Sequence, residues 1–535
     1  MPTHTHASEL PRRAVIFSLV GVAAAMLMAA LDATIVGTAM PRVIAELQGF
    51  EHYTAVTTAY LLASTVILPL SGKLSDLYGR KPFLLAGVAI FAVASALCGA
   101  AQSMTQLVLF RGLQGIGGGI AQGMAFTTIA DLFPPARRGR VTGLMGSIFG
   151  LASVAGPTLG GFLTDGPGWR WCFYVNVPVG IAAFLVLLFE FPHIVSKRES
   201  KPVIDYAGAA TLVLSVVPVL LALSWGGRDY AWGSSTILGL LGFGLAMFAL
   251  FLRVEGRAKE PIIQLSMFKP RVIWTSAGAA ATIAMAMFGT TLFIPLFIQG
   301  VIGTSASRSG AVQTPLMLTL IAGSIASGQI VTRLGKYRIV AITGASLTTT
   351  AMFLLSRMNV DTSYGEVLRN MVIMGAGLGL TMPIFTLSVQ NAVPIRQLGA
   401  ATSSVQFLRT MGGSLGAAIF GAILANRFAP ALHAAISPEL LQRLPPGALE
   451  RLSNPQLLMA PQTLARLSAD GNAAPLVAAL RSALATALHD VFVAGTIVVL
   501  FALSFTWLLV DIPLRTTNRH PEKQADAVPA APLEI

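Results

Sequence analysis

Charged residues are scarce in this chain. Asp, Glu, Lys and Arg together make up 11% of its 535 residues, whereas hydrophobic residues make up 54%. Soluble globular proteins contain about 25% charged residues, so this chain lacks the polar surface that would face water. Apolar runs of about 18 or more residues recur from end to end, and each is long enough to cross a bilayer as a helix. The composition therefore predicts an all-α polytopic membrane protein.

Cysteine is also rare. The two cysteines, Cys98 and Cys172, fall near the predicted outer ends of helices. A disulfide between them and two separate buried thiols are both compatible with the sequence, and buried thiols are common in protein cores. No structural role follows from them.

The motifs of nucleotide-dependent and metal-dependent proteins are missing. Gly72-Lys73 and Gly335-Lys336 are followed by Leu and Tyr, where a phosphate-binding loop has Ser or Thr. The glycine run at 115–119 continues with Ile120, where the dinucleotide fingerprint requires another glycine. The sequence has no HExxH motif and no Cys/His metal-ligand spacing. We therefore expect no enzyme activity, no metal and no bound cofactor.

The basic excess does not suggest a nucleic-acid partner. Lys and Arg number 36 against 23 Asp and Glu, which gives a formal net charge of +13. These residues form short groups between the apolar runs, which is where topology determinants lie, rather than one basic face. With the N-terminus in the cytoplasm, most of them fall on the cytoplasmic side. We expect a multi-pass protein of the cytoplasmic (inner) membrane, with both termini cytoplasmic and the lipid bilayer as its surroundings.

Polar, Gly and Pro breaks divide the apolar runs into fourteen predicted helices. They cover residues 14–38, 53–73, 82–102, 105–131, 140–164, 172–191, 205–225, 235–253, 271–297, 309–332, 338–357, 366–390, 400–425 and 490–510. The predicted organisation is an N-terminal tail (1–13), a six-helix bundle (14–194), two inserted helices with linkers (195–270), a second six-helix bundle (271–510) that includes an outer loop (427–489), and a C-terminal tail (511–535).

The second bundle repeats the first. The glycine run that starts at Gly115 has a counterpart at Gly375, and Gly156 has one at Gly416, both 260 residues later. Each match alone is weak, because glycine is common in membrane helices. Ordered matches at one offset predict parallel six-helix halves, an architecture of transporters whose substrate site lies between the halves near the membrane midplane.

Asp32 is the most informative residue. An acid within a membrane helix costs about 2.5–3.5 kcal/mol on insertion scales and normally marks an ion pathway, although an acid near the interface can also snorkel. Arg111 lies roughly 10 Å from the outer end of its helix, a depth similar to that of Asp32. We expect the two to form a proton-coupling pair. The alternative for Arg111 is a structural contact with buried carbonyls.

The loop after the second predicted helix combines an acid with spaced glycines. Gly72 and Gly79 permit a tight turn and close backbone approach. Asp76 can bind a helix N-terminus or a basic residue such as Arg80 and thereby latch one conformation of the two halves. The alternative is that Arg80 and Lys81 only fix the topology.

Gly156-Pro157 is expected at mid-membrane depth. The proline would kink its helix, and Gly160 and Gly161 would let a neighbouring helix pack closely. These residues predict a tight, kinked seam.

A large apolar cavity with scattered polar contacts would suit a drug-sized ligand. Candidates for its lining are aromatic and amide side chains in the predicted helices, and the alternative for each is a core or lipid-facing position. They are Tyr60, Gln122, Phe126, Phe288, Phe293, Phe297, Phe385, Gln390 and Gln406.

The loop from Gly72 to Arg80 resembles the signature of the major facilitator superfamily. Further segments resemble its 14-helix drug:proton antiporter branch, the EmrB/QacA type. They are Leu31–Val36 with Pro41, Arg111–Gly117, Gly143 with Gly156–Gly161, Trp169–Gly180, and Gly399–Ser414 with Gln406 and Arg409. The resemblance implies antiport driven by a proton gradient. Three departures are Gly37 in place of Asn, Ala152 in place of a glycine, and Thr332 in place of the acid of the second-half loop.

The function expected from the sequence is proton-coupled export of amphipathic or cationic drugs and toxic compounds. Export of one endogenous metabolite or siderophore by the same mechanism is an alternative, and a non-transporting membrane sensor or scaffold is another. The segment 427–489 either contacts a periplasmic adaptor protein, and through it an outer-membrane channel, or caps the last membrane helix.

Overall fold

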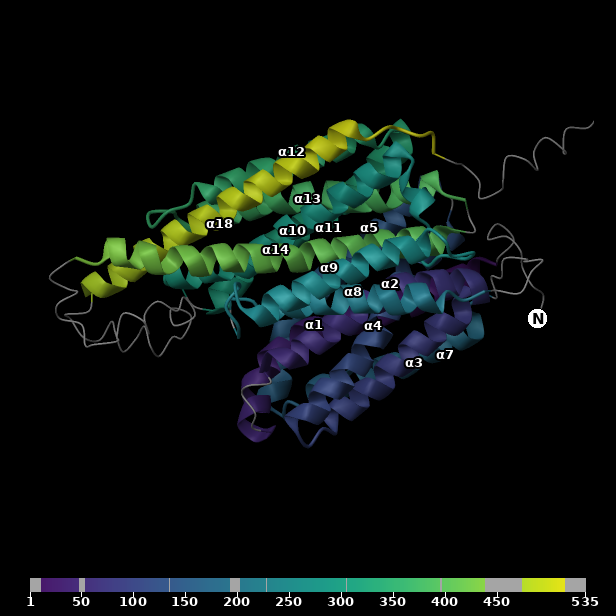
Figure 1. The fold of residues 1–535 in the computed structure, drawn as a ribbon, viewed down its shortest axis with the longest axis horizontal. Helices are drawn as coiled ribbons and strands as arrows, with labels where there is room; N and C mark the ends of the chain where they lie inside the picture. The colour runs from purple at the N-terminus through teal and green to yellow at the C-terminus, as the bar shows by residue number, and fades with distance from the viewer. Residues whose placement is uncertain are drawn as a thin grey trace, which may run out of the picture.

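A computed structural model of the chain describes residues 11–47, 53–133, 135–192, 203–227, 229–304, 306–394, 397–437 and 474–514. Apart from one bridge between Gly226 and Tyr230, these residues form helices, turns and bends (Figure 1). The helices are α1 (Arg12–Leu47), α2 (Tyr53–Tyr78), α3 (Arg80–Gly99), α4 (Met104–Leu132), α5 (Pro135–Asp165), α6 (Trp171–Tyr174), α7 (Asn176–Glu190), α8 (Tyr206–Trp225), α9 (Ser235–Glu255), η3 (Leu265–Phe268), α10 (Arg271–Leu296), the π-helical η4 (Phe297–Val301), α11 (Ala306–Leu334), α12 (Arg338–Ser356), α13 (Tyr364–Ala392), α14 (Leu398–Ala435) and α18 (Ala474–Leu508).

Several helices begin at side chains that satisfy their first backbone N–H groups. Ser103 Oγ accepts from the backbone N–H of Gln106 at the start of α4, and Asp205 accepts from that of Gly208 at the start of α8. Ser363 and Glu366 form a reciprocal capping box at the start of α13. Each cap replaces the water that a membrane-embedded helix end would otherwise need.

The helices α1 to α7 pack together as one group, the N-group. It has six membrane-length elements, because the short α6 and α7 together form one of them. Within it α4 packs on α1, α2 and α3, while α1 packs on α5 and α7. The core of this group includes Val22, Phe91, Met124 and Leu187, all fully buried.

The second group, the C-group, comprises α10 to α14, η4 and α18. There α13 packs on α11 and α12, and α10 and α18 pack on α14. Its hydrophobic core runs through all of these helices and includes Phe385, Phe420 and Phe492. The predicted all-α fold with two helix groups is confirmed.

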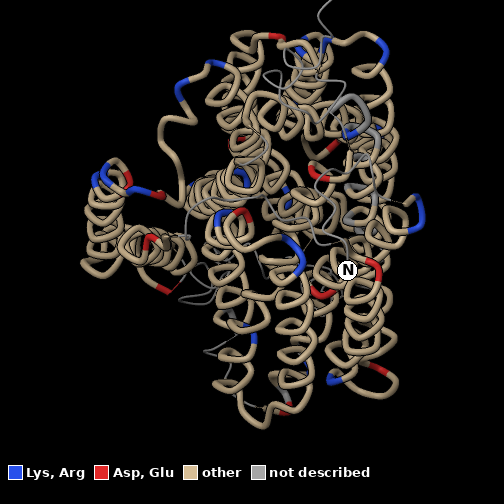
Figure 2. Tube along the Cα trace, turned by 90° about the vertical axis from the view of Figure 1, so that its right-hand side faces the viewer, with Lys and Arg blue, Asp and Glu red and all other residues tan. Residues whose placement is uncertain are grey.

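The two groups meet along two pairs of helices, α2 with α14 and α5 with α11. We call the end of the bundle where α2 ends and α14 begins the latch end; it lies on the right in Figure 1. Figure 2 views the molecule from this end, where Lys and Arg residues lie at helix ends and connections.

The inserted helices α8 and α9 pack on each other, and α8 also packs on α2 and α14 (Figure 1). One small core joins Leu212 of α8 to Val66 of α2 and Phe407 of α14. Lys73 Nζ lies 2.7 Å from Glu260 Oε2, which ties the linker after α9 to α2. The inserted pair therefore covers one side of the junction between the two groups.

One sequence expectation remains untested and another differs from the structure. Twelve helices among the described residues are long and apolar enough to span a membrane, and α4 and α5, which are richer in glycine and polar residues, are not among the twelve, so the count of fourteen spans stays a prediction. Helices α14 and α18 extend well into the predicted loop 427–489, because an apolar run marks the membrane-compatible part of a helix and not its end. Residues 438–473 of that loop lie outside the described residues.

Candidate transport site

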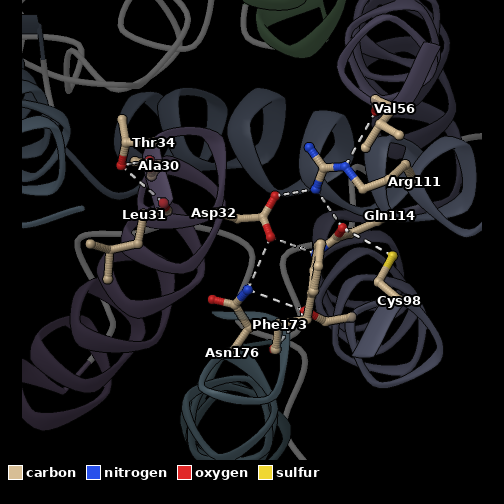
Figure 3. A network of polar contacts seen from close by, with 11 residues as sticks. Ala30, Leu31, Asp32, Thr34, Val56, Cys98, Arg111, Gln114, Phe173 and Asn176 are labelled. Carbon is tan, nitrogen blue, oxygen red and sulfur yellow. Dashed lines mark hydrogen bonds and ion pairs between the residues drawn. The ribbon is translucent and has the colours of Figure 1, made fainter. Parts of the chain in front are cut away.

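Asp32 lies at the centre of a buried polar network (Figure 3). Its Oδ2 lies 2.5 Å from Arg111 Nη1, and its Oδ1 accepts from Gln114 Nε2 at 2.8 Å and from Asn176 Nδ2 at 3.1 Å. Asp32 is 0% exposed and Arg111 is 2% exposed, so water does not screen this ion pair. All three partners donate N–H groups, so the arrangement fits the carboxylate form of Asp32.

Arg111 is held on several sides. Its Nη1 also donates to Gln114 Oε1 at 2.6 Å, and its Nε lies 3.5 Å from the backbone oxygen of Val56. The guanidinium carbon lies 4.4 Å from the centre of the Tyr60 ring, a cation–π contact. Tyr60, which the sequence suggests as a cavity-lining residue, therefore belongs to the ion-pair network.

Ser95 joins the network to a further helix, α3. Its Oγ lies 3.0 Å from Gln114 Nε2 and 3.1 Å from Asn176 Nδ2, and it donates to the backbone oxygen of Phe173 at 2.9 Å. With Val56 and Tyr60 of α2, the network thus connects α1, α2, α3, α4 and α7. A change in the Asp32–Arg111 contact would affect five helices of the N-group at once.

The loop motif links the two groups at the latch end. Asp76 forms an ion pair with Arg80, and its carboxylate accepts the backbone N–H groups of Gly399 at 3.1 Å and Ala400 at 2.8 Å, in the first turn of α14. A carboxylate at a helix N-terminus is stabilised by the helix dipole. Arg80 also lies 2.7 Å from Asp131 Oδ2.

Glycines make this close approach feasible. A Cβ built on Gly72 would lie 2.5 Å from Ser403 Cβ and 2.7 Å from the backbone oxygen of Gly399, so α2 and α14 pack closely only because residue 72 has no side chain. Gly79 has a φ of 94°, a left-handed conformation that a side chain would strain, and it turns the chain from α2 into α3.

The seam residues lie where α5 crosses α1. A Cβ on Gly156 would lie 2.7 Å from Thr34 Cβ, and one on Gly160 would lie 2.9 Å from the backbone oxygen of Ile35. Gly161 differs from the expectation, since a Cβ there meets nothing within 4 Å. Gly143 and Pro157 also lie in α5, and their surroundings are outside the described part of the structure.

The suggested cavity residues separate into two sets. Phe293, Phe297 and Phe385 lie in the hydrophobic core of the C-group, and the ring of Phe288 covers Gly413, so these four pack within that group. Phe126, which also belongs to the hydrophobic core of the N-group, and Gln390 instead lie where α4, α13 and α14 meet, and Gln406 is buried on α14. Gln390 Nε2 lies 3.4 Å from the backbone oxygen of Phe126 and 3.1 Å from Thr402 Oγ1. Gln122 is half-buried on α4.

Sequence reasoning did not single out Ser95 or Asp131, and it gave no role to Gln114 and Asn176 beyond their motifs. A serine or amide in an apolar helix is a weak signal, because such side chains often bond to their own helix backbone. Cys98 and Cys172 are buried free thiols.

Comparison with known proteins agrees with this geometry. The family model of the Major Facilitator Superfamily matches residues 22–417. The chain belongs to this superfamily. The facilitator chain is 41% identical to the multidrug transporter protein MdtP of Bacillus subtilis. The alignment spans 527 residues and covers 96% of each chain. It is 39% identical to multidrug resistance protein 3 of the same organism over 82% of this chain and 85% of the relative.

A solved structure has the same fold as this facilitator. The human organic anion transporter MFSD10 (TETRAN) superposes with a TM-score of 0.56, over 92% of this chain and 100% of that one. Sequence identity is 14%, so this likeness concerns the fold alone.

Proposed function

We propose that this facilitator is a proton-coupled antiporter that exports amphipathic drugs and toxic compounds by alternating access. The observation that carries the proposal is the buried ion pair between Asp32 and Arg111, whose side chains are the least exposed among the ion pairs of the described N-group residues. An ionisable pair sealed from water inside membrane helices is costly and typically serves an ion pathway. The multidrug transporters to which the chain is similar support drugs as the substrate class.

The pair suggests how a proton would be coupled to transport. In the arrangement described, Asp32 accepts three N–H donors and is matched to its charged form. A movement that takes Arg111 away would leave a buried carboxylate without its counter-ion, which favours proton uptake. Return of Arg111 would expel the proton, so proton binding would alternate with rearrangement of the helices that meet in this network.

The latch end would face the cytoplasm, and both termini would lie there. The contacts of Asp76 with α14 would close that side while the opposite side is open. Lys and Arg residues at helix ends of this side support the orientation (Figure 2). The cytoplasmic membrane is the proposed location.

If the protein contacts an adaptor protein, and through it an outer-membrane channel, the contact would lie in the segment 427–489. Residues 474–488 of that segment form the first turns of α18 and continue into its membrane-length part. This continuity favours a role of the segment as a cap on the last helix rather than as an adaptor contact.

The test is proton release from proteoliposomes that contain the full-length protein, on addition of a panel of cationic, neutral and anionic amphipathic compounds. Wild-type protein and Asp165→Asn, which changes an exposed acid at the far end of α5, should release protons in response to several compounds. Asp32→Asn should bind the compounds and release none. Undiminished proton release by Asp32→Asn would reject the coupling role.

The same panel distinguishes the alternatives. A response to a single compound class with no broader protection in cells would favour an exporter of one metabolite. Absence of flux for every compound, with intact folding, would favour a sensor or scaffold.

A further inference from the structure

Arg409 lies deep in the membrane-length part of α14. It follows Ala400, at the latch end, by nine residues, which places it roughly 14 Å along the helix at 1.5 Å per residue. This is about half of the roughly 30 Å of a bilayer core. The residue therefore lies near the depth at which transporters of this architecture bind substrates.

No carboxylate of the described chain neutralises Arg409. The described helices of the C-group contain two acidic residues: Glu366, in the first turn of α13, and Asp490, which pairs with Arg427. Asp32 pairs with Arg111 in the N-group. Within the described residues, the contact found for the Arg409 guanidinium is the ring of Phe126, 5.8 Å from its carbon. A ring face attracts a cation but does not cancel its charge.

A second, independent observation lies one turn away on the same helix. Gln406 is 1% exposed, and neither its Nε2 nor its Oε1 has a hydrogen-bond partner in the described structure. The buried Ser403 Oγ, one further turn along, also has none. Residues three apart are neighbours on a helix surface, so Gln406 lies between Ser403 and Arg409 in a polar row that winds along α14. Buried polar groups without partners are costly, and a ligand commonly supplies what the protein does not.

The row faces the junction between the two groups. A Cβ on Gly72 of α2 would lie 2.5 Å from Ser403 Cβ, and Phe126 of α4 lies beside Arg409. The position is thus between the halves, where a substrate of the proposed exporter would lie.

We propose that Arg409 and Gln406 bind the anionic group of an amphipathic substrate. This rests on the proposed function and names its substrate class. The guanidinium would bind a carboxylate or sulfonate through two parallel N–H donors, the amide of Gln406 would donate a further hydrogen bond, and Phe126 would contact the apolar body. A cation at this position would meet an uncompensated like charge, so the preferred class differs from the cationic compounds that the sequence favours.

The test compares three probes that share one ring system and differ in charge: naphthaleneacetate, its neutral amide, and a naphthylmethyl-trimethylammonium ion. Binding of each tritiated probe to the purified full-length protein is measured by scintillation proximity. Wild-type protein should bind the carboxylate about tenfold or more tightly than the other two, a difference of about 1.4 kcal/mol. Arg409→Gln should remove this preference and retain binding of the amide, Arg409→Lys should keep part of it, and Gln406→Leu should weaken it.

Arg427→Gln is the matched control, because Arg427 lies on the same helix but is exposed and already paired with Asp490. It should bind all three probes as the wild type does. Thermal unfolding of each variant in detergent shows whether it is folded. Equal binding of carboxylate and amide by the wild type, or an unchanged preference in a folded Arg409→Gln, would overturn the proposal.

The anion site and the antiporter function can be rejected independently of each other. Charge-selective binding that depends on Arg409, without proton release in proteoliposomes, would reject the antiporter and keep the anion site. Proton release on addition of the cation alone, with no carboxylate preference, would keep the antiporter and reject the anion site.

Discussion

The carboxylate of Asp76, at the end of α2, lies 3.1 Å from the backbone nitrogen of Gly399, at the start of α14. The two residues are 323 positions apart in the sequence and belong to different helix groups. One side chain of the N-group thus caps a helix of the C-group, and the contact can exist only while the two groups are close at this end.

Removing the charge of Asp76 should loosen the latch end. Asp76→Asn keeps the size of the side chain but loses the ion pair with Arg80 and the attraction to the helix dipole, worth about 1–2 kcal/mol in partly buried sites. That energy changes a population ratio about fivefold to thirtyfold. Spin labels at the exposed Tyr78 and Leu334 should show a new, longer distance in the variant. A distance distribution identical to that of the wild type would contradict a latch.

Alanine should be tolerated at one seam glycine and not at another. In Gly156→Ala the new methyl group would collide with Thr34 and force α1 and α5 apart, at a cost of about 1–3 kcal/mol. Gly161→Ala adds the same atoms in open space and is the matched control. A thiol-reactive fluorogenic dye, which reports exposure of the buried Cys98 and Cys172, should show a lower unfolding temperature for the first variant alone. Equal unfolding temperatures would show that the seam relaxes at little cost.

Loss of one partner of the Asp32–Arg111 pair should lower the stability of the folded protein more than loss of both partners. Arg111→Gln leaves a fully buried carboxylate without a counter-ion, a change that typically costs about 3–5 kcal/mol. The double variant Asp32→Asn with Arg111→Gln removes both charges and should unfold at a higher temperature than Arg111→Gln alone. Additive effects in this cycle would mean that the two side chains are not coupled.

Glu46 should stabilise the opposite end of the bundle in a pH-dependent way. Arg170 and, to a lesser extent, the indole N–H of Trp169 lower the pKa of Glu46 by binding its carboxylate. Because the pKa is lower in the folded protein, the contribution is complete above the unfolded pKa of about 4.3 and is lost as the pH falls through the folded pKa.

The effect of Glu46 should be small, since its side chain is 51% exposed and solvent screens the pair. We expect Glu46→Gln to lower the unfolding temperature slightly at pH 7. The difference should shrink at acidic pH and in high salt. A difference that is the same at both pH values would show that the charge of Glu46 contributes nothing.

Much of the fold was predictable from local signals. The span predicted at 205–225 corresponds to α8, Tyr206–Trp225, because Asp205 caps its start and Gly226 follows its end. The span predicted at 338–357 corresponds to α12, Arg338–Ser356. The end of α14 was missed, since the helix continues to Ala435 beyond its apolar run.

The site was predictable only in part. The sequence places Asp32 and Arg111 at similar depths, and the structure brings them into contact. Gln114, Asn176 and Ser95 could not be assigned to them, because helices that are apolar on most faces give no periodic signal for which side points inward. The cavity residues show the same limit: Phe385 packs into a hydrophobic core, whereas the amide of Gln406 is buried without a hydrogen-bond partner in the described structure.

The sequence alone determined that the chain forms long apolar helices, that its halves repeat, and which few ionisable residues lie within the membrane. These properties depend on composition and on spacing along one chain. The tertiary structure decided which charges meet, since Asp32 and Arg111 are 79 residues apart and depend on the rotation of two separate helices. Among the described residues it also left Arg409 without a carboxylate partner. One helix alone cannot show this, because counter-ions in a membrane protein come from neighbouring helices brought together by packing.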